Sequence, residues 1–208
     1  MSSVAAAGVV AEAQRLLAGL KSPLLADFLR LWPTGPPRAT DAAPASLPGL
    51  RHLPAATRRA PPFSAPFAGA LAAAASALTW RRSYTQAIVG AEFWDNYGWT
   101  ELVGLSSAAH SERLACGIML LGPRVIYPLH HHEAEEMYVP LSGTADWKLG
   151  AHPWEAQAPG NVIHHPSNES HAMRTAETAL LALYLWRSDN LAQKSQLDAL
   201  EVQEVRGV

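Results

Sequence analysis

The chain has 208 residues, 49% of them hydrophobic, and a formal net charge of -2 at pH 7. A chain of this length can bury one sizeable core and carry an accessory segment besides. The near-neutral balance of charge argues against a nucleic-acid-binding surface. Cys116 is the only cysteine, which excludes an intrachain disulfide and a thiolate metal cluster, and we expect it to be an inert, buried strand residue.

The start of the chain predicts a cytoplasmic location. Met1-Ser2-Ser3 lacks the basic residues of a signal peptide, and Glu12 and Arg15 interrupt the apolar run that follows. No stretch reaches the roughly 18 apolar residues that a membrane-spanning helix needs. We therefore expect no membrane partner.

Residues 1–80 are predicted to form a cap of helices and extended chain. Apolar residues recur at helical spacing from Val9 to Leu20, and a second short helix is expected over residues 23–31, with Pro23 in its first turn. Residues 33–66 contain nine prolines and lose this periodicity, which predicts an irregular linker. Residues 68–78 are alanine-rich and expected to be helical. We expect the cap to cover one end of a barrel, with a protein-interaction module as the alternative.

Residues 81–208 are predicted to form a β-domain with a short closing helix over residues 189–205. From Tyr84 onward, short β-branched and aromatic runs alternate with turn residues, a texture typical of an all-β sandwich or barrel. Strands are expected at residues 86–89, 99–105, 114–121, 124–127, 136–141, 144–149, 162–165, 171–174 and 179–186. Ser142-Gly143 and Pro159-Gly160 predict turns between strands.

The segment from His130 to Tyr138 predicts half of a metal site. Side chains on a strand alternate between its faces, so His130 and His132 point one way and His131 the other. After a short turn, Glu136 and Tyr138 share a face as well. Neutral imidazole and carboxylate suit a borderline divalent ion, and a phenolate beside such an ion can act as a base near neutral pH.

The same residues resemble the cupin superfamily. His130, His132, Glu136 and Gly143 fit its first motif, although the upstream glycine is displaced to Gly122. Residues 159–166 resemble the second motif, whose ligand histidine would be His171, with His164 or His165 as the competing ligand. This resemblance implies a mainly β fold, a double-stranded β-helix or jelly-roll barrel, with the N-terminal helical cap added to it.

Residues 84–186 look like the bacterial cupin-type dimethylsulfoniopropionate lyases. The likeness is carried by residues 127–138, by Leu141-Ser142-Gly143, by His165-Pro166-Ser167 and by His171-Ala172-Met173. It implies one divalent metal, zinc or iron(II) first and manganese, nickel or cobalt as further candidates. The implied ligands are His130, His132, Glu136 and His171.

The resemblance also implies a β-elimination that gives dimethyl sulfide and acrylate. Tyr138 would be the base, and Tyr127 would line the pocket as a second catalytic candidate. The partner would be a small zwitterionic sulfonium, and aromatic faces attract such a cation. The candidate substrate-binding residues are Tyr127, Trp186, Tyr184 and His165, with Trp94 and Trp99 as further aromatic candidates.

Two other functions remain open at this stage. A regulatory cupin could hold zinc through the same four ligands without catalysis. An iron-dependent dioxygenase is the second alternative, although three His, one Glu and one Tyr leave little room for oxygen and a cosubstrate. The sequence leaves the oligomeric state open between a monomer and a homodimer.

Overall fold

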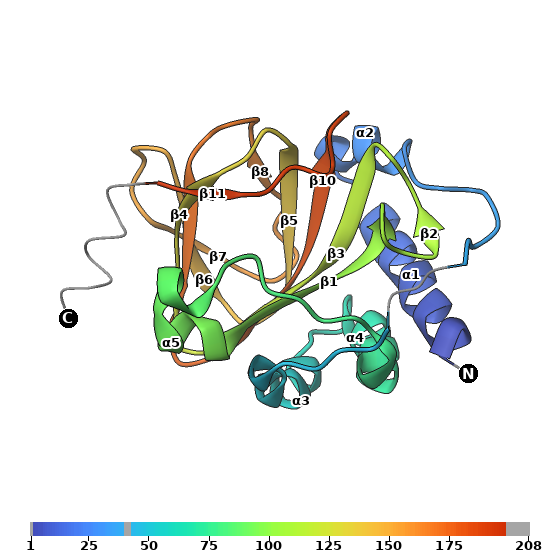
Figure 1. Ribbon diagram of the computed structural model, residues 1–208, viewed down its shortest axis with the longest axis horizontal. Coiled ribbons are helices and arrows are strands. Elements are labelled where there is room, and N and C mark those ends of the chain that lie inside the picture. Colours follow the sequence, from blue (N-terminus) through green and yellow to red (C-terminus); the bar gives the residue numbers. More distant parts are fainter. Residues whose placement is uncertain (1, 40–42, 199–208) are drawn as a thin grey trace.

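Two mainly antiparallel sheets face each other and enclose the interior of a barrel, and helices cover one sheet from outside (Figure 1). The structure is a computed structural model and describes residues 2–39 and 43–198. This is the jelly-roll barrel with an N-terminal helical region that the two cupin motifs predict. Among the described residues, no helix is both long and apolar enough to cross a membrane.

Helices occupy most of the first half of the chain. They are α1 (Ser2–Gly19), α2 (Pro23–Leu29), η1 (Pro48–His52), α3 (Leu53–Arg58), α4 (Ala65–Ala74), η2 (Ala75–Ala77) and α5 (Gln86–Asn96). The predicted linker at residues 33–66 is therefore wrong in part, because η1 and α3 lie within it. Pro48 and Pro54 stand in the first turns of these two helices, where a missing backbone N–H costs nothing.

Strands fill the second half of the chain. They are β1 (Tyr97–Gly104), β2 (Ala109–His110), β3 (Leu114–Leu121), β4 (Ile126–His131), β5 (Glu135–Ser142), β6 (Ala145–Leu149), β7 (Glu155–Gln157), β8 (Ile163–His165), β9 (His171–Thr175), β10 (Leu180–Arg187) and β11 (Gln196–Leu197). One sheet has the order β2-β1-β3-β10-β5-β8, and the other β11-β4-β9-β6-β7. Each predicted strand from residue 99 onward overlaps an observed one. The predicted turns are confirmed, with Gly143 and Gly160 both at positive φ.

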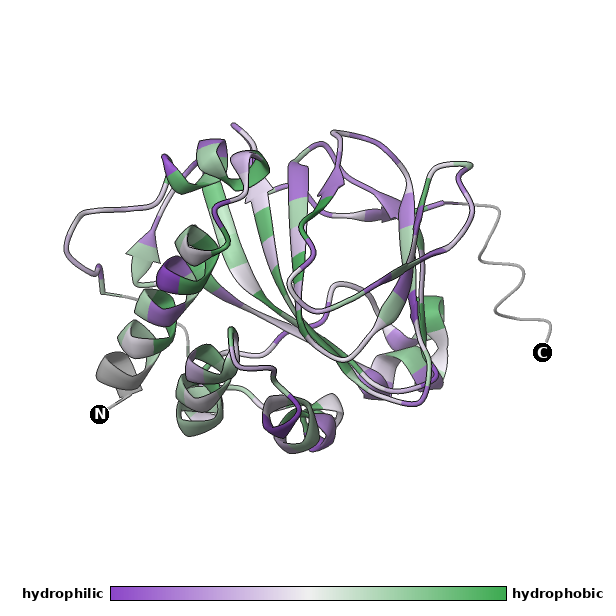
Figure 2. Ribbon diagram, turned by 180° about the vertical axis from the view of Figure 1, so that it is seen from behind, coloured by the Kyte–Doolittle hydropathy of each residue, from purple (hydrophilic) through white to green (hydrophobic). Residues whose placement is uncertain are grey.

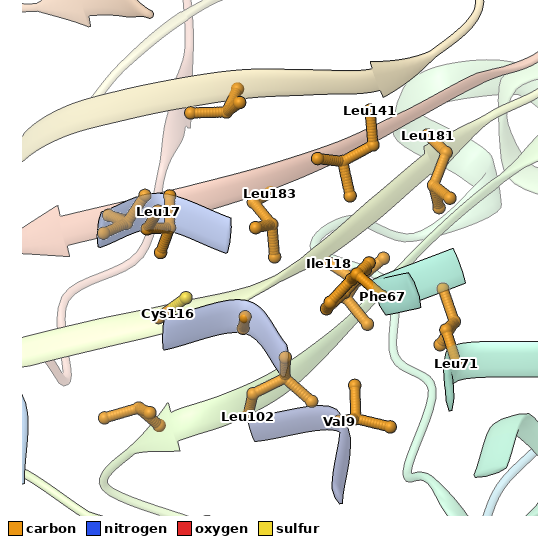
Figure 3. Close-up of a cluster of buried hydrophobic side chains, with 14 of the residues drawn as sticks. Val9, Leu17, Phe67, Leu71, Leu102, Cys116, Ile118, Leu141, Leu181 and Leu183 are labelled. Carbon is orange, nitrogen blue, oxygen red and sulfur yellow. The ribbon is translucent and has the colours of Figure 1, made fainter. Parts of the chain in front are cut away.

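The larger sheet is buried on both faces. Cys116 and Ile118 of β3 and Leu183 of β10 point outward and pack on Leu17 of α1 and Phe67 of α4 (Figure 3). All eight residues of β3 are buried, which explains why its sequence is a continuous apolar run and does not alternate. Hydrophobic colour on the facing sides of helices and strands marks this layer in Figure 2. Burial raises the pKa of the Cys116 thiol, so it stays protonated and inert.

The cap covers a face of the barrel, and not one end as the sequence suggested. Its attachment includes two buried hydrogen bonds to β5. Ser64 Oγ donates to the carbonyl of Leu141 at 2.8 Å, and Ser142 Oγ donates to the carbonyl of Ala56 at 2.7 Å. A flat, wholly apolar sheet face needs a broad cover, and the helices supply it.

Two predicted elements differ in kind from the observed ones. Residues 86–89 belong to α5, which is kinked at Gly90 (φ 78°, ψ 163°), and Val89 and Phe93 on either side of the kink are buried against the side chains of the barrel interior. The predicted closing helix is absent from residues 189–198, where the chain instead adds β11 to the free edge of β4. The rest of that predicted helix, residues 199–205, lies outside the described residues.

Candidate active site

Strands of both sheets bring His130, His132, Glu136 and His171 together. His130 of β4 is paired with His171 of β9 across the smaller sheet, while Glu136 lies on β5 of the larger one. All four side chains are 3% exposed or less. His131 points the other way, and its Nδ1 lies 2.6 Å from Asp198 Oδ1. The predicted alternation of the three histidines is therefore confirmed.

Backbone carbonyls fix the orientation of three imidazole rings. The Nδ1 atom of each lies 2.7–2.9 Å from a carbonyl oxygen two residues away, namely Pro128 for His130, Ala134 for His132 and Glu169 for His171. In this arrangement Nδ1–H donates to the carbonyl, and Nε2 of each ring faces the interior. A second hydrogen bond of this kind sets the tautomer of metal-binding histidines in general.

The Glu136 carboxylate lies among these rings. Its Oε2 is 3.1 Å from His132 Nε2 and 3.2 Å from His171 Nε2, and its Oε1 accepts a hydrogen bond of 2.6 Å from Trp186 Nε1. Burial alone would raise the pKa of Glu136, but His132 and the hydrogen bonds around the carboxylate hold it well below its usual range. The carboxylate is therefore ionised at neutral pH.

The remaining histidines near the site have different surroundings. His165 presents Nδ1 to Glu136 at 3.2 Å and stacks on His171, with 4.0 Å between ring centroids. Burial, with a contribution from His171, lowers the pKa of His165 to about 4. His164, partly exposed, bonds to Glu135 on the opposite side of β8. The structure thus separates the two histidines that the sequence left as competitors.

The donor set fits one divalent ion. The inward nitrogens of His130, His132 and His171 lie within 4.8 Å of one another, as do the ligand atoms of Glu136, His165 and His171. His171 Nε2 is buried and lies 3.2 Å from Glu136 Oε2, outside the angles of a good hydrogen bond. Burial, followed by the charge of His171, lowers the pKa of His130 well below its usual value, so that ring is neutral. A neutral imidazole beside an ionised carboxylate is the ligand form that zinc and iron(II) require. Burial alone would lower the pKa of His132, but the charge of Glu136 and the hydrogen bonds to the ring together raise it above its usual value, so that ring would release a proton when an ion binds.

A cavity of about 280 Å³ lies directly in front of these groups. Tyr127, Tyr138, Tyr184 and Trp186 line it together with His130, His132 and Glu136, while His165 lies behind Glu136 and is not among the lining residues. Trp99 lines the cavity too, whereas Trp94 stacks on Arg82 instead. A larger cavity of about 600 Å³ among the cap helices is lined mostly by apolar residues, and the metal-competent groups lie elsewhere.

The two predicted catalytic tyrosines are buried at this cavity. Tyr127 stacks on His130 with 4.2 Å between ring centroids, and its hydroxyl lies 3.3 Å from that of Tyr97. Burial raises the pKa of Tyr138 well above its usual value, and the negative charge of Glu136 raises it further. Without a nearby positive charge, both phenols are fully protonated at neutral pH.

Several lining residues were missed by sequence reasoning. Tyr97 and Glu101 flank Trp99 with a period of two on β1, and this strand alternation could have revealed them. Lys194 and Ser195 belong to the segment that precedes β11. No local pattern marks those two, because their position depends on the pairing of β11 with β4.

The comparisons with known proteins agree with this geometry. Residues 34–182 match the family model described as dimethylsulfoniopropionate lyase. The chain is 33% identical over 186 residues to dimethylsulfoniopropionate lyase DddQ of Ruegeria pomeroyi, covering 87% of this chain and 88% of that protein. The chain belongs to the dimethylsulfoniopropionate lyase family. As a member of this family it is a lyase, as the sequence motifs implied.

Solved structures of the family share its whole fold. The crystal structure of DddQ from Ruegeria pomeroyi has a TM-score of 0.82 at 31% identity and covers 93% of this chain and 95% of that one. A chain described with the crystal structures of the lyases RdDddP and RnDddQII has a TM-score of 0.83 at 32% identity, covering 95% and 100%. The family likeness therefore includes the helical cap as well as the barrel.

Proposed function

We propose that this lyase cleaves dimethylsulfoniopropionate to dimethyl sulfide and acrylate by β-elimination, with one divalent metal ion in its site. The observation that carries the proposal is the convergence of Tyr138, Glu136, His130 and His132 at one cavity, with the inward nitrogen of His171 within 4.8 Å of those of His130 and His132. A base, a set of metal ligands and an aromatic wall are the groups that this elimination needs.

The metal ligands in this proposal are His130, His132, Glu136 and His171. Three of them present Nε2 inward because their Nδ1 atoms are held by backbone carbonyls, whereas His165 turns Nδ1 to Glu136 and orients that carboxylate. A bound divalent cation supplies Lewis-acid stabilisation of the substrate carboxylate and of the Tyr138 phenolate.

Tyr138 is the general base of the reaction. Its phenolate oxygen takes a proton from the carbon beside the substrate carboxylate. The electron pair of that C–H bond forms the carbon–carbon double bond of acrylate, and the pair of the C–S bond leaves with neutral dimethyl sulfide. Tyr138 then returns the proton to water. The reaction needs no redox cofactor, since no atom is oxidised or reduced by an external partner.

The aromatic side chains orient the substrate and keep water out. Tyr127 is fixed by its stack on His130, and Trp186 is fixed by its hydrogen bond to Glu136 and its contact with His132. Tyr127 and Trp186 thus enclose the substrate beside the metal ligands, while the face of Tyr184 attracts the sulfonium, which has no N–H donor, by about 0.5 to 2 kcal/mol. A positioned substrate turns proton transfer into an effectively intramolecular step.

The experiment that tests this proposal is headspace detection of dimethyl sulfide from purified protein and dimethylsulfoniopropionate. Metal-loaded protein should release it, chelated protein should not, and re-addition of zinc or iron(II) should restore release. Absence of dimethyl sulfide from protein shown to contain stoichiometric metal would overturn the proposal.

The same assay separates the alternative functions. Turnover under strict anaerobic conditions excludes an iron-dependent dioxygenase, which consumes oxygen. Release that depends on Tyr138 excludes a regulatory cupin in which the ion is only structural. The choice of metal, a cytoplasmic location and the state as monomer or homodimer remain predictions, since the donor set suits several ions.

A further inference from the structure

We propose that Glu101 recognises the positive charge of the substrate and determines the specificity of the cavity for a cation. This inference rests on the proposed function. A zwitterion whose carboxylate lies at the Glu136 end of the cavity presents its sulfonium to the other end. Glu101 is a carboxylate that lines the same cavity and has no role in the elimination described above.

The register of the larger sheet places Glu101 in one row with the catalytic residues. Glu101 is opposite Gly117, Gly117 is opposite Tyr184, and Tyr184 is opposite Tyr138. Three strand spacings of about 4.8 Å separate the backbones of Glu101 and Tyr138, so a small substrate fits between their side chains. The two ends of one sheet row thus border the two ends of the cavity.

Gly117 leaves room in this row for the ring of Tyr184. A Cβ atom at this position would lie 2.5 Å from the Tyr184 hydroxyl and 2.6 Å from its ring, so the ring extends over the space that a side chain would fill. Tyr184 in turn meets Trp99 edge-on, with 6.3 Å between ring centroids and an angle of 82°. An aromatic surface therefore lines the way between Tyr138 and Glu101.

The Glu101 carboxylate is held by a turn of its own chain. The backbone N–H of Ser106 donates to Oε1 at 2.8 Å, and a Cβ atom on Gly104 would collide with the carboxylate. Burial raises the pKa of Glu101, opposed by the Ser106 N–H and the charge of Arg81. Arg81 Nη1 donates a hydrogen bond to Ser106 Oγ at 3.3 Å and so helps to fix the turn that holds the Glu101 carboxylate. A cation in the cavity would therefore meet a carboxylate that is held in place.

Arg81 lies near Glu101, with its Cζ 5.7 Å from the centroid of the Trp99 ring, but the positive side chains that line the cavity itself lie in another part of it. Lys194 precedes Ser195, whose hydroxyl is 2.9 Å from that of Tyr84, and the Tyr84 ring packs edge-on against Tyr127. Arg82, two residues before Tyr84, also lines the cavity. The Tyr127 part of the cavity therefore favours a carboxylate, and the Glu101 end favours a cation, which fixes the direction in which a zwitterion binds.

Two carboxylates of one shape test the charge preference directly. 3-(Trimethylammonio)propionate and 4,4-dimethylpentanoate differ only in a cationic nitrogen against a neutral carbon, and neither has the sulfonium leaving group. Their affinities for metal-loaded wild-type protein and for the Glu101→Gln variant are measured by calorimetry. The comparison across variants removes the difference in hydration between the two ligands.

The variant should lose affinity for the cation alone. The attraction between two unit charges about 8 Å apart, at an effective dielectric of about 20, corresponds to a 10- to 30-fold change in a dissociation constant. The cation should therefore bind about 10- to 30-fold more weakly to Glu101→Gln than to the wild-type protein. Binding of the neutral acid should change by less than about twofold. KM for dimethylsulfoniopropionate should rise while kcat should not fall, because the positive charge decreases as the C–S bond breaks and Glu101 therefore stabilises the bound substrate at least as much as the transition state.

The matched control is Glu155→Gln, which removes one negative charge from an exposed position on β7. It should leave both affinities unchanged. An equal loss for both ligands in Glu101→Gln would show that Glu101 only holds its turn, and would overturn the inference. If Glu101→Gln does not fold, wild-type protein decides, because binding the neutral acid as tightly as the cation overturns it too. Wild-type protein without dimethyl sulfide release would overturn the proposed function itself.

Discussion

Replacing Tyr138 with Phe tests the proposed base and leaves the buried ring in place. Tyr138 is 5% exposed, and its ring centroid is 6.1 Å from that of Trp147 and 5.6 Å from that of His165. The variant loses only the phenol oxygen. Positioned proton transfer contributes roughly 10²- to 10⁴-fold to a rate, or about 3 to 5 kcal/mol of barrier, so acrylate formation should fall by that factor.

Stability and metal content should change far less than turnover in this variant. The phenol meets Glu136, and losing one such contact costs about 1 kcal/mol, which lowers Tm by about 2–4 °C in a chain of this size. Wild-type activity should decline as the pH falls, because the Tyr138 phenolate becomes protonated. The residual activity of the variant should not show this decline.

Acrylate, bound metal and thermal unfolding are measured on the same preparation. Tyr84→Phe serves as the control, because it removes a phenol oxygen from a tyrosine that is not among the cavity-lining residues. Turnover above about a tenth of the wild-type value in Tyr138→Phe would refute the assignment of the base. Tyr127 would then be the next candidate.

Three further predictions concern the metal site. Elemental analysis of His132→Ala or Glu136→Ala should show metal and activity lost together, and full occupancy with normal turnover would contradict the ligand assignment. His131→Ala should keep nearly all of its metal because this ring faces Asp198; a loss like that of His132→Ala would mean the strand register is wrong by one residue. Metal-free protein should become less stable as the pH falls from about 6.5 towards 4. The pKa of His165 is about 4 when folded but about 6.5 when unfolded, so the unfolded chain binds more protons in that window. Urea denaturation midpoints that stay constant from pH 7 to 5 would speak against this.

The sequence determined which residues share a face at the site. Strand periodicity is local, so it alone predicted that His130 and His132 face inward and that His131 faces away. The sequence also predicted the turn at Gly143, because this position has a positive φ that few residues other than glycine adopt. Two motifs in the right order were enough to predict the barrel.

Tertiary structure decided what local patterns could not. Residues 87–89 have apolar side chains that suit a strand or a helix, and packing of Val89 and Phe93 against the barrel interior selected the helix. The segment after residue 189 contains a strand, β11, because the edge of β4 was available for pairing. The residues around β11 carry no signal of that distant edge.

The same long-range pairing completed the active site. His165 and His171 present different ring nitrogens to Glu136, and Glu101 reached the cavity only through the register of β1, β3 and β10. Contacts between residues far apart in the chain are set by how the two sheets and their cap pack. The sequence therefore specified the candidate site residues, and the packing of the two sheets specified the cavity beside them.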